Sequence, residues 1–349
     1  MNIRPILPEK SHKPLIIAGP CSAESEEQIL TAAHALSKHP EVDFLRASVW
    51  KPRTFPGDFE GVGAIGLEWL RKAKEETGLK TCTEVAHATH VEQAIKSGID
   101  MVWIGARTTV NPFLVEEIAE AVANYDIAVM VKNPVNPDGD LWIGALERFI
   151  RKGADRIGAI HRGFSMYRKV MYRNEPFWEI VFELKRHYPT LPVINDPSHL
   201  TGDKTLVQAM CQKALDLEAD GLMIEVHPHP EKALTDRQQQ LSFSDFSNLL
   251  KTLVYHNPKE NIPSADILKI RTQIDEIDFE IIKLLAHRME LAQKIGDVKR
   301  ENQMTILQME RWKDVVETRL NFGNTTGLER NFLLKILQTI HEESLRIQF

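Results

Sequence analysis

The sequence has few cysteines, no apolar run of membrane-spanning length and no strong excess of charge. Its three cysteines, Cys21, Cys82 and Cys211, lie far apart in 349 residues, so neither a disulfide framework nor a Cys-x-x-Cys metal site is indicated. No apolar run approaches the roughly 20 residues that cross a bilayer, and the N-terminus lacks the apolar segment of a signal peptide. The net charge of -6 does not favour binding to nucleic acid or to an anionic membrane surface. We therefore expect a cytoplasmic protein without nucleic-acid or membrane partners.

Short apolar runs alternate with amphipathic stretches of helical length from Pro14 to about His256. The apolar runs are PLIIAGP, FLRASVW, LKTCTEV, MVWIGA, IAVMVKN, DRIGAIH, LPVIND and GLMIEVH. Continuous apolar runs are typical of strands that are buried on both faces, and their alternation with helices indicates parallel βαβ units. Eight such units predict an α/β protein with a closed (β/α)8 barrel, or TIM barrel. An open doubly wound sheet is the alternative, but no Gly-x-Gly-x-x-Gly follows the first run.

The composition changes after the eighth unit. We divide the chain into a barrel, a linker and a helical domain, over residues 1–256, 257–265 and 266–349. The linker contains prolines and polar residues, and beyond it apolar residues recur at spacings of three and four. We predict three helices in this tail. The first is long and begins at Ile267, the second spans about 307–322 and ends at Gly323, and the third extends from about Leu328 to the C-terminus.

Polar residues stand where the expected strands end, which is the face at which (β/α)8 enzymes carry their chemistry. Cys21 follows the first strand, His199 follows the seventh, Glu225 ends the eighth and Asp236 lies just beyond it. Taken singly, each has a simpler explanation: Cys21 can be a small buried apolar group, and the Asp-Pro before His199 an ordinary turn. Together, a thiolate, an imidazole and two carboxylates favour one divalent manganese, iron, cobalt or zinc ion over magnesium or calcium.

A set of cations occupies the same strand ends. Its members are Arg46, Lys51, Arg53, Arg107, Lys132 and Arg162. Six cations on one rim would repel one another, but they suit ligands with several negative charges, because arginine grips phosphate and carboxylate bidentately. A solvated basic surface explains any one of them, but does not explain cations that end buried strands. We therefore expect a metal-assisted enzyme that acts on phosphorylated or carboxylated metabolites.

All of these residues except Lys132 lie in six motifs, GPCS, LRASVWKPRT, IGAR, HRG, NDPSH and ADGLMIEVHPHPEKALTD. In this order, over about Pro14–Leu241, they resemble 3-deoxy-D-arabino-heptulosonate 7-phosphate (DAHP) synthase of the type I-beta group. That family condenses phosphoenolpyruvate with erythrose 4-phosphate and releases phosphate. The resemblance implies that the four candidate ligands hold a metal ion, manganese foremost, and that Lys51 donates a proton to the aldehyde oxygen. It further implies that the tetrose phosphate is bound by Arg53 and Thr54. The implied phosphoenolpyruvate site consists of Arg46, Lys51, Arg107, Lys132 and Arg162.

A related synthase that uses arabinose 5-phosphate is the nearest alternative for the barrel. The motif KPRT argues against it, because that relative carries Asn where this sequence has Pro52. One position departs from the resemblance, since His161 stands where an acidic residue is expected before Arg-Gly. This departure changes the surroundings of Arg162 but removes none of the implied roles.

The long helix expected in the tail carries two cations on one face. Arg288 and Lys299 are eleven residues apart, or about three turns. The same face carries Leu284, Ala292 and Ile295. Both cations should therefore point toward the packed side, where an unpaired cation is costly unless an anion meets it. Arg271 lies about 25 Å before Arg288 along a helix, so it would serve a pocket on another copy. A dimerising helix with solvated charges is the simpler interpretation.

The tail, over about Ile267–Gln348, resembles the all-helical chorismate mutase family, an intertwined dimer of three-helix chains. That family rearranges chorismate to prephenate without a nucleophile, an acid or a cofactor. The resemblance implies that Arg271 reaches into the partner's pocket. It also implies that Arg288, Lys299 and Arg311 contact the substrate's carboxylates and ether oxygen. The other residues implied for the pocket are Gln308, Ser344 and Gln348.

Two positions depart from the mutase pattern. Gln308 stands where the family often has Asp, and Trp312 where it often has Glu, and both positions hold the substrate's hydroxyl. The alternative is therefore a catalytically weak tail that dimerises and senses prephenate or chorismate. Only about thirteen residues precede the first expected strand, so we expect no N-terminal regulatory domain. We expect prephenate to lower synthase activity through the tail instead.

Overall fold

The computed structural model describes residues 3–7, 14–167, 171–255 and 265–349, and the chain forms two compact units. The first unit is Met1–Pro258 and the second is Lys259–Phe349. The predicted linker, 257–265, falls almost wholly outside the described residues, so this boundary stays a prediction. None of the described helices is both long enough and apolar enough to cross a membrane.

The first unit is a closed parallel barrel in which the eight strands follow one another in chain order, and β1 also pairs with β8. The (β/α)8 barrel predicted from the sequence is confirmed. The strands are β1 (Leu15–Gly19), β2 (Val42–Arg46), β3 (Lys80–Val85), β4 (Met101–Ile104), β5 (Ala128–Lys132), β6 (Ile157–His161), β7 (Val193–Asn195) and β8 (Gly221–Glu225). Gly19 lies opposite Glu225 in the β1–β8 register, so the end of β1 lies beside the end of β8.

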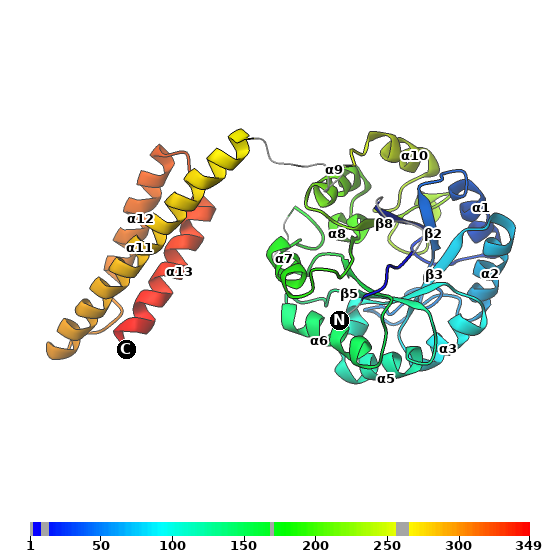
Figure 1. The fold of residues 1–349 in the computed structure, drawn as a ribbon, viewed down its shortest axis with the longest axis horizontal. Helices are drawn as coiled ribbons and strands as arrows, with labels where there is room; N and C mark the ends of the chain where they lie inside the picture. Colours follow the sequence, from blue (N-terminus) through cyan, green and yellow to red (C-terminus); the bar gives the residue numbers. More distant parts are fainter. Residues whose placement is uncertain (1–2, 8–13, 168–170, 256–264) are drawn as a thin grey trace. The chain divides into compact units, whose positions relative to one another are not determined.

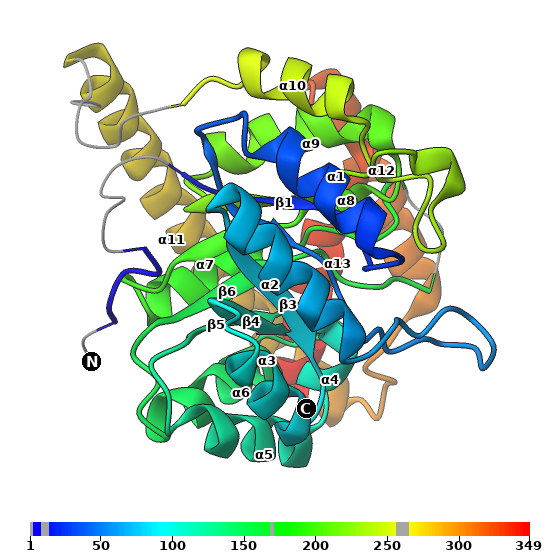
Figure 2. The same cartoon turned by 90° about the vertical axis from the view of Figure 1, so that its right-hand side faces the viewer.

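Helices form an outer ring around the strands (Figure 1), and α1 and α2 lie side by side on the outside of the barrel (Figure 2). The main helices are α1 (Glu26–Leu36), α2 (Ile65–Thr77), α3 (Ala88–Lys96), α5 (Pro112–Val122), α6 (Gly139–Arg151), α7 (Trp178–His187), α9 (Lys204–Asp216) and α10 (Phe243–Thr252). Short helices follow three of the strands or their loops, namely α4 (Ala106–Thr109), α8 (Pro197–Thr201) and the 3-10 helix η1 (Pro230–Lys232).

Apolar side chains form two clusters, one between strands and helices and one inside the barrel. The inner cluster contains Phe44, Trp103 and Met130, and it also contains Ile6 and Leu7 from the segment before β1. The Ile6 carbonyl accepts a hydrogen bond from Arg156, which directly precedes β6. The N-terminal segment therefore covers the end of the barrel where the strands begin, and the polar strand ends lie at the opposite face.

The second unit consists of α11 (Ala265–Glu301), α12 (Met309–Thr325) and α13 (Arg330–Gln348), which confirms the three-helix tail. The prediction that Gly323 ends the second helix is wrong, because α12 continues to Thr325. Gly323 is buried instead, and a Cβ there would lie 2.1 Å from a methyl carbon of Leu333. A glycine at this position allows α13 to pack closely against α12 and does not end the helix.

Candidate active site

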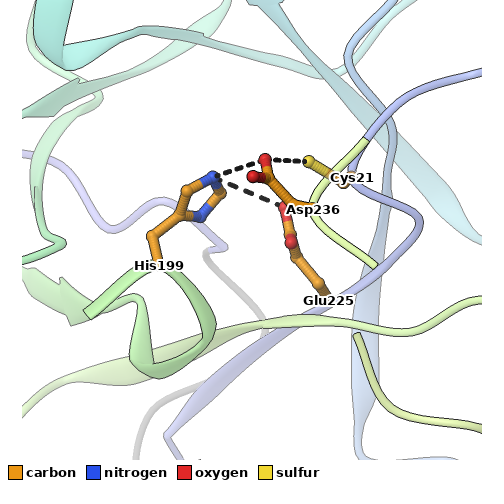
Figure 3. A group of neighbouring side chains, drawn as sticks. All are labelled: Cys21, His199, Glu225 and Asp236. Carbon is orange, nitrogen blue, oxygen red and sulfur yellow. Dashed lines mark hydrogen bonds and ion pairs between the residues drawn. The ribbon is translucent and has the colours of Figure 1, made fainter. Parts of the chain in front are cut away.

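The four candidate ligands of the barrel lie together at the carboxyl ends of its strands. The ligand atoms of Cys21, His199, Glu225 and Asp236 all lie within 4.8 Å of one another. Figure 3 shows the Asp236 carboxylate between the His199 ring and the Cys21 sulfur, with Glu225 approaching from the end of β8. A soft thiol, an imidazole and two carboxylates at this spacing fit a single divalent transition-metal ion.

The segment Asp-Pro-Ser-His after β7 forms a helical turn rather than a simple loop. Asp196 is the N-cap of α8, and its carboxylate accepts the His199 backbone N–H. The same carboxylate lies 2.8 Å from His199 Nδ1. His199 Nε2 then faces the other candidate ligands, at 3.6 Å from Glu225 and 4.0 Å from Asp236. A carboxylate on the far nitrogen of a histidine is how metal-binding imidazoles are commonly oriented.

Charges around the site keep its carboxylates ionised. Burial alone would raise the pKa of Glu225, but His199 and Arg46 hold it below its usual value. Burial likewise opposes ionisation of Asp236, but Lys51 and His199 hold its pKa far below the usual range. Burial, and then Glu225, raise the pKa of the Cys21 thiol well above its usual value. The anionic carboxylates are thus ready for a cation, whereas the thiol must lose its proton to bind one.

The backbone of Asp236 adopts an uncommon conformation. Its φ is 48°, in the left-handed region that Asp tolerates better than most side chains. Arg173 donates to Asp236 Oδ1 at 2.9 Å, and the Cys21 sulfur lies 3.1 Å from Oδ2. Such backbone geometry is retained where surrounding contacts over-determine it, often at functional sites.

Lys51 lies directly against the candidate ligands. Its ammonium donates to Cys21 Sγ at 2.6 Å and lies 3.5 Å from Asp236 Oδ2. Burial would lower the pKa of Lys51, but Cys21 and Asp236 raise it above the usual value. The lysine is therefore protonated at neutral pH and can donate a proton to an oxygen that comes close to it.

Two predicted cations are buried inside the mouth of the barrel. Arg46 lies 3.2 Å from Glu225 Oε1, and Lys132 donates to Asp196 Oδ2 at 2.7 Å. Arg46 Nη1 is buried and has no hydrogen-bond partner among the described residues. A buried, unpaired guanidinium nitrogen is costly, so an anionic ligand at this position would satisfy it.

The other predicted cations lie farther out. Arg107 is exposed and donates to the Thr54 hydroxyl at 2.8 Å, which joins the loops after β4 and β2. Arg53 is half-buried and pairs with Asp58 of its own loop at 3.4 Å. Arg162 is buried after β6, and burial lowers its pKa to about 10. The barrel therefore holds an inner group of cations and an outer pair, Arg53 and Arg107, of which Arg107 contacts Thr54.

Three polar residues at this site escaped the sequence analysis. Arg173 donates to Asp236 and also to Gln239, and Gln239 donates to Glu225 Oε2 at 2.7 Å. Asn174 accepts from Arg162 at 2.8 Å. The run of three glutamines, QQQ, after Asp236 is an unusual composition that could have drawn attention to Gln239. Arg173 and Asn174 follow no strand directly, so reading strand ends could not find them.

In the helical unit, α11 brings two of its predicted cations to α13. Arg288 donates to the Ser344 hydroxyl, and Lys299 lies 3.5 Å from Gln348 Oε1. Ser344 and Gln348 are buried. Of the apolar residues predicted on the same face, Ala292 is buried, whereas Leu284 and Ile295 are exposed in the single chain. In the single chain the predicted packed side is therefore present at Ala292 and absent at Leu284 and Ile295, and packing of these two residues stays a prediction.

The remaining predicted residues of the helical unit make other contacts. Arg271 is exposed near the start of α11, and Arg311 pairs with Asp314 on its own helix. Gln308 is the N-cap residue of α12. Trp312 stacks on His341 of α13, with ring centroids 3.9 Å apart and planes 11° apart. An aromatic pair therefore occupies the position where an acid was expected.

The barrel and its strand ends define an enzyme in which a candidate metal site adjoins buried cations for an anionic substrate. Residues 4–258 match the model of the DAHP synthetase I family, and the chain belongs to that family. Residues 270–349 match chorismate mutase type II. The chain therefore joins a DAHP synthase barrel to a C-terminal chorismate mutase domain.

Individual relatives agree with this assignment. A phospho-2-dehydro-3-deoxyheptonate aldolase of Thermotoga maritima is 32% identical over 238 residues, which cover 68% of each chain. The crystal structure of that aldolase has a TM-score of 0.61 to this chain, with 68% of this chain and 67% of that one covered. A 2-dehydro-3-deoxyphosphooctonate aldolase of Nitratidesulfovibrio vulgaris is 28% identical over 263 residues, covering 68% of this chain and 90% of that protein.

Proposed function

We propose that the barrel condenses phosphoenolpyruvate with erythrose 4-phosphate to give DAHP and phosphate, and that Cys21, His199, Glu225 and Asp236 hold one divalent ion, foremost Mn2+. The observation that carries this proposal is the approach of these four ligand atoms to within 4.8 Å beside buried cations. Glu225 Oε1 is buried and accepts no hydrogen bond among the described residues, although Arg46 lies 3.2 Å away, so this oxygen can also meet a metal ion. When bound, the ion supplies Lewis-acid polarisation of the aldehyde.

The inner cations would bind phosphoenolpyruvate. Arg46 and Lys132 are both buried, and Arg162 lies beside Asn174 at the next strand end. Together with Lys51 and Arg107, they offset the phosphate and carboxylate charges that would otherwise keep two anionic substrates apart. Binding also orients the enol so that its terminal carbon faces the aldehyde.

Arg53 and Thr54 would bind the phosphate of the tetrose. Both lie in the loop after β2 and are more exposed than the inner cations, as suits the distal end of a second substrate. The Thr54 hydroxyl accepts from Arg107, so this loop is already tied to the phosphoenolpyruvate cations. The arabinose 5-phosphate reaction is the alternative, and Pro52 in the motif KPRT favours the tetrose over it.

Lys51 would complete the carbon–carbon bond formation. The C3 carbon of phosphoenolpyruvate attacks the aldehyde carbon, and the protonated Lys51 donates its proton to the aldehyde oxygen. Water then adds to C2 of the resulting cation and gives up one proton, which replaces the proton lost by Lys51. The bond between C2 and the bridging oxygen breaks, the phosphate leaves with that oxygen, and the C2 hydroxyl becomes the carbonyl as its proton passes to the phosphate. The position of Lys51, 2.6 Å from Cys21 Sγ, supports this role because an aldehyde near the candidate ligands is also near the ammonium.

Removal of the metal tests the barrel proposal. We expect a chelator to abolish DAHP formation and added Mn2+ to restore it. Cys21→Ala should lose most activity at any Mn2+ concentration, whereas Cys211→Ala, a buried thiol on α9, should keep it. Full activity of Cys21→Ala in the presence of chelator would contradict both the metal site and its ligands.

For the helical domain we propose rearrangement of chorismate to prephenate. Arg288, Lys299 and Arg311 would contact the carboxylates and the ether oxygen, where negative charge develops in the transition state. Ser344 and Gln348 already bond the first two cations and would complete the pocket together with Gln308. No cofactor is needed, because the reaction requires only a compact substrate conformer and well-placed charge.

A sensing tail with little catalysis is the second candidate for this domain, and the Trp312–His341 stack favours it. A tryptophan cannot accept a hydrogen bond from the substrate's hydroxyl as an acid would. The two candidates differ in one experiment on the full chain treated with chelator, which silences the synthase alone. Prephenate formation supports the mutase, whereas binding of prephenate without turnover supports the sensor.

The helical domain would form a homodimer. Large apolar side chains are exposed along much of α11 in the single chain, among them Ile274, Ile281, Leu284, Leu291 and Ile295. An exposed apolar surface of this extent is typical of a partner interface. Arg271, near the start of α11, would then reach the pocket of the other copy.

Prephenate would lower synthase activity through this domain. The barrel and the helical domain act in one biosynthetic pathway. Prephenate, the product of the helical domain, can therefore control the barrel by binding to the tail. A truncated chain that ends near Tyr255 should keep synthase activity and lose inhibition by prephenate. Equal inhibition of the truncated and intact chains would exclude control through the tail.

A further inference from the structure

A tryptophan lies beneath the two innermost cations of the barrel. Trp103 is the third residue of β4, is fully buried, and belongs to the apolar cluster inside the barrel. The guanidinium carbon of Arg46 is 5.0 Å from the centre of its ring, and Lys132 Nζ is 5.8 Å from it. Both distances lie within the range, about 6 Å, over which a cation is attracted to an aromatic face.

Each of these cations also has a carboxylate partner. Arg46 lies 3.2 Å from Glu225 Oε1, and Lys132 lies 2.7 Å from Asp196 Oδ2. Trp103 therefore lies close to the cations of two buried ion pairs. Two like charges held in a buried site repel each other, and attraction of both to one ring reduces that cost.

Packing alone does not account for a tryptophan at this position. Its Nε1 is buried and has no hydrogen-bond partner among the described residues. A phenylalanine or a leucine would contribute to the same apolar cluster without burying an unsatisfied donor. Tryptophan, however, has the aromatic face that attracts cations most strongly.

We propose that Trp103 is a positioning residue for phosphoenolpyruvate: its ring sets the spacing of Arg46 and Lys132 so that both meet one multiply charged anion. This inference rests on the proposed synthase function. The aromatic face of Trp103 positions the two cations, and the indole N–H takes no part. Trp103 acts through the two cations and does not touch the reacting atoms.

Two substitutions at the same position separate the ring face from the rest of the side chain. Trp103→Leu should raise the KM for phosphoenolpyruvate about tenfold, the factor that corresponds to about 1.4 kcal/mol. The KM for erythrose 4-phosphate and the bound metal per chain should stay at parental values. Trp103→Phe keeps a weaker aromatic face, so its KM for phosphoenolpyruvate should lie between those of the parent and Trp103→Leu. Calorimetric titration of the chelator-treated protein with phosphoenolpyruvate should give the same ranking.

A control substitution removes a different buried aromatic. Phe149 on α6 is fully buried in the outer cluster between strands and helices. Phe149→Ala should lower the unfolding temperature while leaving both KM values unchanged. This control shows how much of any change at Trp103 comes from a loosened core.

Four results would overturn the inference. The KM for phosphoenolpyruvate could stay unchanged in Trp103→Leu, or both KM values could rise together, as in a generally loosened barrel. Phe149→Ala could raise the KM for phosphoenolpyruvate as much as Trp103→Leu does. Trp103→Phe could raise the KM for phosphoenolpyruvate as much as Trp103→Leu does, which would assign the positioning role to the indole N–H. If the parent neither binds nor consumes phosphoenolpyruvate, the proposed function fails first and this inference falls with it, so the parental assay distinguishes the two failures.

Discussion

The Asp196 carboxylate lies 2.8 Å from Nδ1 of His199, three residues further along the chain. The same carboxylate caps α8 and accepts a hydrogen bond from Lys132. Burial would raise the pKa of Asp196, but His199 and Lys132 hold it well below the usual range. One ionised side chain thus fixes the start of a helix, the direction of an imidazole and the position of a lysine.

Loss of this carboxylate should weaken metal binding. Asp196→Asn keeps the shape of the side chain but removes the negative charge beside His199. We expect a 10- to 100-fold loss of Mn2+ affinity, the usual effect of removing such a partner. Competition with a coloured chelator measures it. Asp203→Asn, which changes the exposed N-cap of α9, is the matched control and should bind as the parent does, so equal affinities in all three proteins would contradict this role.

The pH dependence of stability should include a contribution from His161. Its ring lies 2.6 Å from the Pro176 carbonyl and 3.1 Å from the Asn195 side chain, so the neutral form has both nitrogens paired. Burial lowers its pKa to about 4, against an unfolded value of about 6.5. The unfolded chain therefore takes up the proton first, and this contribution is complete above pH 6.5 and is lost as the pH falls toward 4.

Replacement of His161 tests this contribution. Between pH 7.5 and pH 4.5 the parent should lose roughly 2 to 3 kcal/mol of unfolding free energy through this group, and His161→Gln should lose that much less. Urea unfolding at the two pH values gives the difference. An equal loss in parent and variant would show that the proton goes elsewhere.

An acid at position 312 should increase mutase turnover. Trp312→Glu offers the substrate's hydroxyl a hydrogen-bond acceptor that the parent lacks, and a gain of about tenfold in kcat/KM corresponds to one such bond. Trp312→Phe keeps an aromatic ring against His341, so its kcat/KM should not rise above that of the parent. Chorismate consumption by the full chains measures this, and a Phe variant as fast as the Glu variant would refute the stated reason.

The exposed face of α11 should control the oligomeric state. Leu284 is 69% exposed in the single chain, so a dimer that covers it should tolerate a charge there poorly. Leu284→Lys should shift sedimentation toward the monomer at micromolar concentration, whereas Glu317→Lys, at an exposed position on α12, should not. A parent chain that sediments as a monomer at every concentration would remove the dimer from the proposal.

The barrel was predictable from sequence because most strands are apolar runs and amphipathic helices alternate with them, so the order of elements implies the closed sheet. The candidate metal site was predictable for the same reason: parallel strands bring their carboxyl ends to one face, and β1 meets β8. The local signal at His199 was ambiguous, because an Asp-Pro pair begins ordinary turns as readily as it caps a helix.

Other features depend on contacts that no periodicity reveals. Arg173 reaches Asp236 from a loop 63 residues away in the chain, so neither residue predicts the other. Trp103 looked like one more apolar residue of a buried strand, and only its position beneath two cations distinguishes it. In the tail, spacing predicted which residues share a helical face, but it could not say which part of that face α13 covers.

The segment that contains Ile6 and Leu7 covers the starting end of the barrel. Because that end is covered, both substrates and both products must pass through the opposite face, at the carboxyl ends of the strands. Arg46 is 1% exposed, whereas Thr54 lies at the surface. On the proposed assignment of these residues, phosphoenolpyruvate would bind before the sugar phosphate, which would then cover it.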